Sequence, residues 1–235
     1  MKLRGMGKSL RRKSFLIGTA LLFFFTVSIF TSYPLPLLTF RAAGAAGQAA
    51  EVDLLIKRIE ARYGPMRGLA AEFEQTYAAG GRVRRESGRL FLARPGRMRW
   101  EYPGKLFIVN GREVWLYILA DREATRADTG AVSDERFPFL FLLGQTNLRR
   151  AFRSIEIVEE GADSRTLRLL PRNNSNLTEL FLSVSIDGRI SKVRMVDRGG
   201  AISEISLRNV RENYVAPADA FRFSPPPGVN VRKQK

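Results

Sequence analysis

The stretch FLARPGRMRWEY, Phe91 to Tyr102, alternates large apolar side chains with charged ones on both sides of a Pro-Gly pair. Its even positions, apart from Gly96, are occupied by Leu92, Arg94, Met98, Trp100 and Tyr102. Such alternation is typical of β-strands that bury one face. The pattern therefore predicts two strands whose shared apolar face includes an arginine, and a buried guanidinium needs hydrogen-bond acceptors.

Segments of the same kind recur along most of the chain. Alternating or continuous apolar character is found at 69–77, 88–93, 98–102, 106–109, 114–118, 155–158, 166–170, 177–186, 189–196 and 201–207. Asn110-Gly111, Asp187-Gly188 and Gly199-Gly200 separate several of them, and these pairs favour tight hairpin turns. About ten strands with short connections predict one large antiparallel sheet that must curl to protect its edges.

One amphipathic helix is predicted at Glu51 to Tyr63, EVDLLIKRIEARY, before the helix-stopping pair Gly64-Pro65. Its apolar face consists of Val52, Leu55, Ile56, Ile59 and Tyr63. This helix is expected to lie against the sheet.

The segment VWLYI, Val114 to Ile118, is apolar throughout, which indicates a strand covered on both faces. Two interpretations remain open: a sheet buried by the helix and by its own curvature, or a curved sheet around an apolar cavity with another element closing its mouth. The segment SDERFPFLFLLGQ, Ser133 to Gln145, is a candidate for that closing element. Its apolar character on all sides is equally typical of an ordinary buried helix.

Composition limits the possible chemistry. The chain has 235 residues, of which 45% are apolar, and this is enough for one domain with a sizeable core. It contains neither cysteine nor histidine, which excludes disulfides, thiolate zinc sites, cysteine nucleophiles and histidine-based triads. We therefore expect no catalytic residue, no metal site and no cofactor.

The N-terminal segment, residues 1–45, has the pattern of an export signal. A basic stretch precedes the apolar run Phe15 to Phe30, and Ala43-Gly44-Ala45 satisfies the small-x-small rule of signal peptidase. The alternative is an uncleaved anchor. Without cysteine, the protein is not expected to be lipidated itself. We predict a signal peptide at 1–45 and one domain at 46–235.

The predicted domain is basic even without its leader. Seven of the 39 basic residues and none of the 23 acidic ones lie in residues 1–45, so the remainder has a net charge of +9. A basic surface favours anionic lipid headgroups or nucleic acid. Export makes nucleic acid the poorer partner.

From about residue 51 to 233, the chain resembles the outer-membrane lipoprotein carrier protein (LolA) family of Gram-negative bacteria. The matching motifs occur in the order of the family, after the N-terminal helix: F-x-Q at 73–75, SG-x-L-x-L-x-RP-x-x-x-x-W at 87–100, NG-x-x-x-W-x-Y at 110–117, PF-x-x-L at 138–142 and F-x-F-x-PP-x-GV-x-V at 221–231.

The resemblance implies an α+β fold that is mainly β: an incomplete antiparallel β-barrel of ten or eleven strands with an N-terminal helix and a helical lid over an apolar cavity. It also implies a monomeric periplasmic chaperone that binds the acyl chains of lipoproteins. This carrier receives them from an inner-membrane ABC transporter and delivers them to an outer-membrane receptor, as a step in outer-membrane biogenesis.

Candidate ligand-binding residues follow from strand parity and from the resemblance. Parity directs Leu90, Leu92, Met98, Trp100 and Tyr102 into the cavity, and the resemblance assigns the lid to Phe137, Phe139, Leu140, Phe141, Leu142 and Leu143. Arg94 matches the family arginine that bonds lid carbonyls and holds the empty carrier closed. The alternative for Arg94 is a solvated arginine at a sheet edge.

Other functions remain to be weighed. A periplasmic lipid or glycolipid carrier, or a lipoprotein sensor, could share this fold. A nucleic-acid module built on RMRWEY would expose its aromatic residues, whereas the alternation predicts that they are buried. An exported hydrolase using carboxylates such as Glu101 and Asp121 has no supporting motif.

Overall fold

The computed structural model describes residues 39–129, 147–173, 176–217 and 219–233. Helix α1 spans Thr39–Tyr63, so it begins well before Glu51, where the sequence pattern begins. It ends at the predicted point, beside Gly64. A second, four-residue helix, α2, spans Leu148–Ala151 and is capped by the side chain of Asn147, which accepts a hydrogen bond from the Arg150 amide. Neither described helix has the length and apolar character needed to span a membrane.

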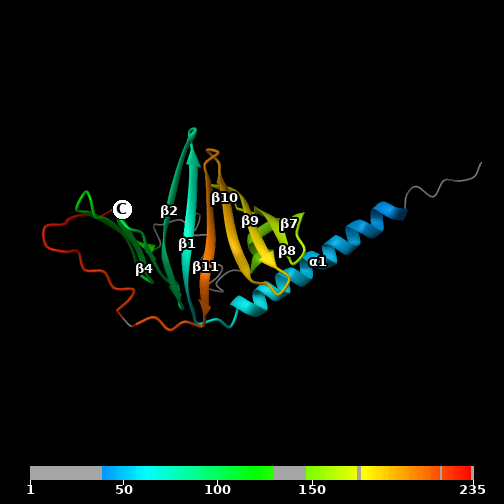
Figure 1. Ribbon diagram of the computed structural model, residues 1–235, viewed down its shortest axis with the longest axis horizontal. Coiled ribbons are helices and arrows are strands. Elements are labelled where there is room, and N and C mark those ends of the chain that lie inside the picture. Colours follow the sequence, from blue (N-terminus) through cyan, green and yellow to red (C-terminus); the bar gives the residue numbers. More distant parts are fainter. Residues whose placement is uncertain (1–38, 130–146, 174–175, 218, 234–235) are drawn as a thin grey trace, which may run out of the picture. The chain divides into compact units, whose positions relative to one another are not determined.

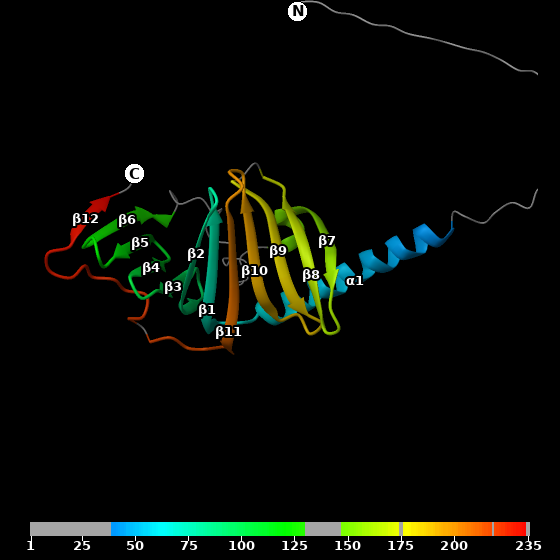
Figure 2. The same ribbon diagram turned by 45° about the horizontal axis from the view of Figure 1, so that its top comes forward.

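The strands form one open twelve-stranded sheet in the order β12-β6-β5-β4-β3-β2-β1-β11-β10-β9-β8-β7 (Figures 1 and 2). Their bounds are β1 Gly68–Ala79, β2 Arg82–Ala93, β3 Arg97–Glu101, β4 Lys105–Asn110, β5 Glu113–Ile118, β6 Glu123–Asp128, β7 Phe152–Glu160, β8 Ser164–Pro171, β9 Leu177–Ser185, β10 Ile190–Asp197, β11 Ile202–Glu212 and β12 Asn230–Lys233. All neighbours pair antiparallel except β12, which pairs parallel to β6.

The predicted open antiparallel sheet is thus confirmed, with two strands more than the ten that the pattern located. β6, EATRAD, lacks the apolar alternation of a strand and exists through its pairing with β5. β12, NVRK, is exposed at all four positions. The predicted lid, residues 137–143, lies outside the described residues.

The hairpin turns occur at the glycine-containing pairs that the sequence indicates. Gly111, Gly188 and Gly200 all have positive φ, which L residues with a side chain rarely adopt. In the β4–β5 turn, the side chain of Asn110 also accepts hydrogen bonds from the amides of Arg112 and Glu113. The longest hairpin, β1–β2, turns at Gly80-Gly81, and β2 starts at Arg82, well before the predicted residue 88.

The core lies between one face of the sheet and α1. The predicted helix face, from Val52 to Tyr63, is buried as expected. It packs in one cluster with alternate residues of the strands, among them Leu69, Phe73, Leu90, Leu92, Met98, Trp100, Leu167, Leu169, Leu180, Leu182, Val193, Ile205 and Leu207. We call this side of the sheet the inner face. The helix crosses the part of the sheet formed by β7 to β11 (Figure 2).

The outer face of β4–β6 is covered by the C-terminal segment, through Phe223 and Val229, and not by curvature of the sheet. Val114 packs into the main core, whereas its neighbour Trp115 belongs to a second cluster with Ile108 and Ala124. The ring of Phe223 lies against Trp115, with 5.3 Å between centroids. The predicted burial on both faces is therefore confirmed at Val114 and Trp115, whereas Leu116, Tyr117 and Ile118 are only partly buried.

Candidate functional site

The inner face of β2 and β3 is the first part of the candidate site. Leu90 pairs with Trp100 and Leu92 pairs with Met98 across the two strands. Leu90, Leu92 and Met98 are fully buried, and Trp100 is 5% exposed. The parity of the sequence thus predicts correctly which side chains of this stretch face inward, and the structure brings them together in the same core cluster as the apolar face of α1.

An aromatic group continues this face toward the free end of the β1–β2 hairpin. The ring of Phe73 contacts Trp100 and Tyr102 edge-on, with centroid distances of 4.7 and 4.9 Å. Tyr102 is only partly buried, and it packs against the main core. Burial, followed by the nearby charge of Glu86, raises the pKa of Tyr102.

A row of polar side chains lies next to these rings. The Tyr102 hydroxyl donates to Oε1 of Gln75 over 2.8 Å, and Nε2 of Gln75 donates to the Ser203 hydroxyl over 2.9 Å. The row therefore runs from the end of β3 to β11. It lies between the buried core and the more exposed end of the inner face. The F-x-Q motif contains Gln75, but sequence reasoning assigned it no role, because its partners come from distant strands.

Arg94 follows β2 in the turn to β3. Its Nη2 donates to the carbonyl oxygen of Tyr63, the last residue of α1, over 2.8 Å. Its Nε is buried and has no hydrogen-bond partner among the described residues. The guanidinium thus uses a free carbonyl at a helix end, which is the type of acceptor it was expected to need. The acceptor belongs to α1; contact with residues 137–143 stays a prediction.

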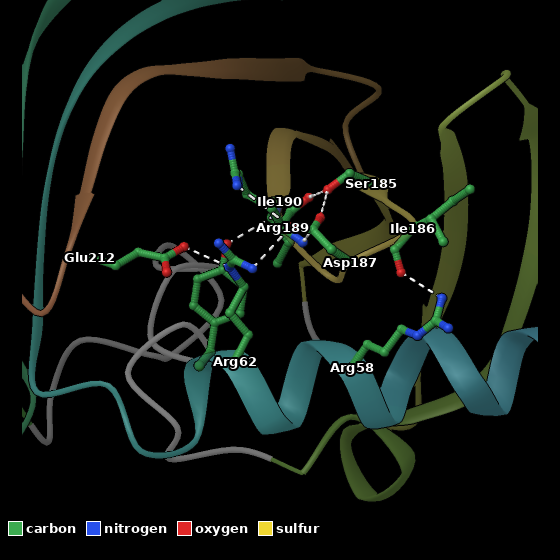
Figure 3. A network of polar contacts seen from close by, with 9 residues as sticks. Arg58, Arg62, Ser185, Ile186, Asp187, Arg189, Ile190 and Glu212 are labelled. Carbon is green, nitrogen blue, oxygen red and sulfur yellow. Dashed lines mark hydrogen bonds and ion pairs between the residues drawn. The ribbon is translucent and has the colours of Figure 1, made fainter.

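Further polar contacts fasten the same end of α1 to β9–β11 (Figure 3). Arg62 binds Glu212 through Nε at 2.6 Å and Asp187 through Nη1 at 3.1 Å. The Tyr63 hydroxyl accepts a hydrogen bond from the Ile190 amide over 2.9 Å. Arg58 donates to the Ile186 carbonyl over 2.7 Å. We call this set, together with the Arg94 bond, the α1 anchor.

The groups of the α1 anchor influence each other electrostatically. A hydrogen bond from Ser185 holds the pKa of Asp187 below its ordinary value, and Arg62 contributes to this shift. Burial raises the pKa of Tyr63. Gly188 completes the fit, because a Cβ at this position would lie 2.7 Å from the backbone carbonyl carbon of Arg58. The anchor therefore depends on close backbone approach as well as on charge.

The described residues contain no group of three or more acidic residues that could hold a metal ion. The site they form consists of an apolar inner face, a helix lying across it and polar bonds that fasten one end of this helix. The partly exposed apolar residues at its margin include Tyr102, Phe107 and Met195.

Sequence comparisons with known proteins indicate one family. The family described as outer membrane lipoprotein carrier protein LolA matches residues 65–224. An outer-membrane lipoprotein carrier protein from Chromobacterium violaceum is 30% identical over 200 residues, covering 83% of this chain and 96% of the relative. One from Pseudomonas aeruginosa is 28% identical over 199 residues, covering 81% and 93%.

Among solved structures, a putative outer membrane lipoprotein-sorting protein domain from Vibrio parahaemolyticus matches with a TM-score of 0.44 and 14% identity, covering 74% of this chain and 97% of that one. The family match extends over β1 to β11, the Arg94 turn and Phe223 of the C-terminal segment. The chain belongs to the LolA family of outer-membrane lipoprotein carrier proteins.

Proposed function

We propose that this protein carries acylated lipoproteins across the periplasm from the inner to the outer membrane, with their acyl chains held against the inner face. The observation that carries the proposal is the construction of the site. A broad apolar face shares one core with α1, which crosses β7 to β11, and polar bonds fasten one end of this helix. When this helix end is released, water can hydrate the charged side chains that had formed these bonds.

The size of the hydrophobic effect explains the need for a carrier. Each methylene contributes roughly 0.8 kcal/mol, so exposing a chain of about 15 methylenes to water costs on the order of 12 kcal/mol. A protein site as favourable as a bilayer never releases its cargo. A site that must break its own bonds in order to open binds less tightly and favours transfer to the next acceptor.

The residues proposed to contact acyl chains are Leu90, Leu92, Met98, Trp100 and Tyr102, with Arg94 and the segment 137–143 controlling access. In the structure the first four are covered. Loading therefore requires that α1 or another covering segment moves away from the inner face. The α1 anchor is the set of bonds that such a movement has to break.

The remaining parts of the proposal follow from the same role. The carrier acts in the periplasm as a monomer, without catalysis and without a cofactor. Its partners are lipoproteins, an inner-membrane ABC transporter that releases them and an outer-membrane receptor that accepts them. These partners are inferred from membership of the family.

The decisive experiment is native mass spectrometry, with lipid extraction, of the protein purified from the envelope of its host. A Leu92→Glu variant, which introduces a charge at a fully buried inner position, is compared with Leu54→Glu at an exposed position of α1. Acylated lipoproteins in stoichiometric complex, lost in the first variant only, support the proposal. Free glycolipids or phospholipids instead indicate a different lipid carrier, and a protein without any lipid indicates a sensor; both results overturn it.

A further inference from the structure

The free end of the β1–β2 hairpin has an unusual concentration of positive charge. The sequence TYAAGGRVRR, residues 76–85, contains three arginines and no acidic residue. Arg82, Arg84 and Arg85 are all exposed. The hairpin lies beside β11, so that its end adjoins the β10–β11 turn (Figure 1). We call residues 76–85 with Ile202 the hairpin tip.

None of the three arginines has an ion pair or a side-chain hydrogen bond within the described part of the chain. The acidic residues on the adjoining parts of the strands are already engaged. Glu74 binds Arg208, Glu86 binds Lys105 and Glu204 binds Lys192, with distances of 2.9, 2.6 and 3.1 Å. The positive charge of the hairpin tip is therefore available to an external partner.

Apolar side chains are exposed among these arginines. Val83 lies opposite Ala78, which in turn lies opposite Ile202, so three apolar residues form a row across β2, β1 and β11. Val83 is 57% exposed and Ile202 is 37% exposed. Tyr77, on the opposite face of β1, is 40% exposed. Water-exposed β-branched residues at the end of a hairpin contribute nothing to the core.

We propose that the hairpin tip is a docking site for an anionic phospholipid surface. The planar guanidinium group matches phosphate oxygens in a two-pronged geometry. Tyrosine is favoured at the level of lipid headgroups, and small aliphatic side chains can enter the boundary between headgroups and acyl chains. One tyrosine and two aliphatic residues give only weak insertion, so the contact is reversible.

Anionic lipid explains the whole tip better than the other polyanions. A nucleic-acid surface that binds single strands uses several aromatic rings for base stacking, whereas the tip has one. An acidic protein surface would satisfy the arginines but gives no reason for the row of Val83, Ala78 and Ile202, in which Val83 and Ile202 are exposed. The proposal is independent of the cargo, because the tip lies outside the buried core of the inner face.

The test measures binding of the full-length protein to vesicles of phosphatidylcholine alone and with 30% phosphatidylglycerol. The tip variant is Arg82→Gln with Arg84→Gln and Arg85→Gln. The matched control is Arg112→Gln with Arg150→Gln and Arg153→Gln, which removes the same charge from exposed sites elsewhere. Both carry the same leader, so its contribution to binding is the same in the two variants and cancels in the comparison.

Each basic residue near an anionic surface contributes about 1 kcal/mol, so the tip variant should lose on the order of 100-fold of its preference for anionic vesicles. The control should lose less than about fivefold, and Val83→Ser, which keeps every charge, should weaken binding severalfold. Equal losses in the tip and control variants overturn the proposal, because they indicate a response to net charge alone. Absence of binding to anionic vesicles also overturns it and redirects attention to an acidic protein partner. Cargo recovery, measured separately, reports on the proposed function.

Discussion

Replacing Arg94 by leucine tests how the cover of the inner face is held. The substitution removes the donor to the Tyr63 carbonyl, a bond of 2.8 Å from a charged group to the last residue of α1. A hydrogen bond to a charged group contributes roughly 1.5–3 kcal/mol, and partial solvent access reduces this value to about 1–2 kcal/mol. Since 1.4 kcal/mol corresponds to a factor of ten, detachment of this helix end should become about 5- to 30-fold more frequent.

Hydrogen–deuterium exchange measures this detachment directly. Amides in the last turns of α1, near residues 59–63, should exchange faster in Arg94→Leu by the same factor. The free energy of unfolding in urea should fall by about 1–2 kcal/mol. If release of this helix end admits acyl chains, the fraction of carrier recovered with bound cargo should also increase.

Arg112→Leu provides the control, because Arg112 is exposed in the β4–β5 turn and its side chain has no hydrogen bond or ion pair within the described residues. Equal exchange of the α1 amides in both variants would refute the anchoring role of Arg94. Faster exchange with unchanged cargo recovery would preserve the anchor and refute its link to loading.

Three further changes test other parts of the structure. Gly188→Ala forces a side chain against the backbone of α1 at a positive φ, so it should lower the free energy of unfolding in urea by about 2 kcal/mol or more. Gly200 also has a positive φ but has open space around it, so Gly200→Ala should lower the same free energy by only about 1 kcal/mol. Hydrogen bonds from Trp115 and an arginine hold the pKa of Glu113 below its usual range. The ionised Glu113 carboxylate therefore stabilises the folded protein above about pH 4.3, and this contribution is lost as the pH falls through the lower pKa of the folded state. Glu113→Gln should therefore destabilise the protein at pH 7 and have little effect in strong acid. Phe223→Ala should cost about 2 kcal/mol and shift the tryptophan emission to longer wavelength, because it uncovers Trp115.

The sequence was most informative where burial repeats with a fixed period. Leu90, Leu92, Met98 and Trp100 alternate with charged residues, and the structure buries all four on one face. The helix face from Val52 to Tyr63 could be predicted for the same reason. Periodicity of this kind reports a local property, which side of an element faces the core.

Elements that depend on their neighbours were not visible in the pattern. β6 and the first half of β2 carry mostly small or charged residues, and they are strands because β5 and β1 supply the hydrogen bonds. The helix-end carbonyl that accepts from Arg94 could not be identified either. Its position depends on how α1 crosses the sheet, which no short stretch of sequence specifies.

The order of strands also determines when this protein can finish folding. β1 lies between β2, which follows it directly in the chain, and β11, which is synthesised much later. β6 pairs with β12, which is synthesised later still. Sheets built from such distant segments form slowly, because a long loop must close before the contacts can stabilise it. A chain that emerges from the ribosome N-terminus first therefore keeps an incomplete sheet until β11 and β12 have been synthesised. The topology thus ties completion of the sheet to the arrival of its two latest strands, whichever compartment the chain folds in.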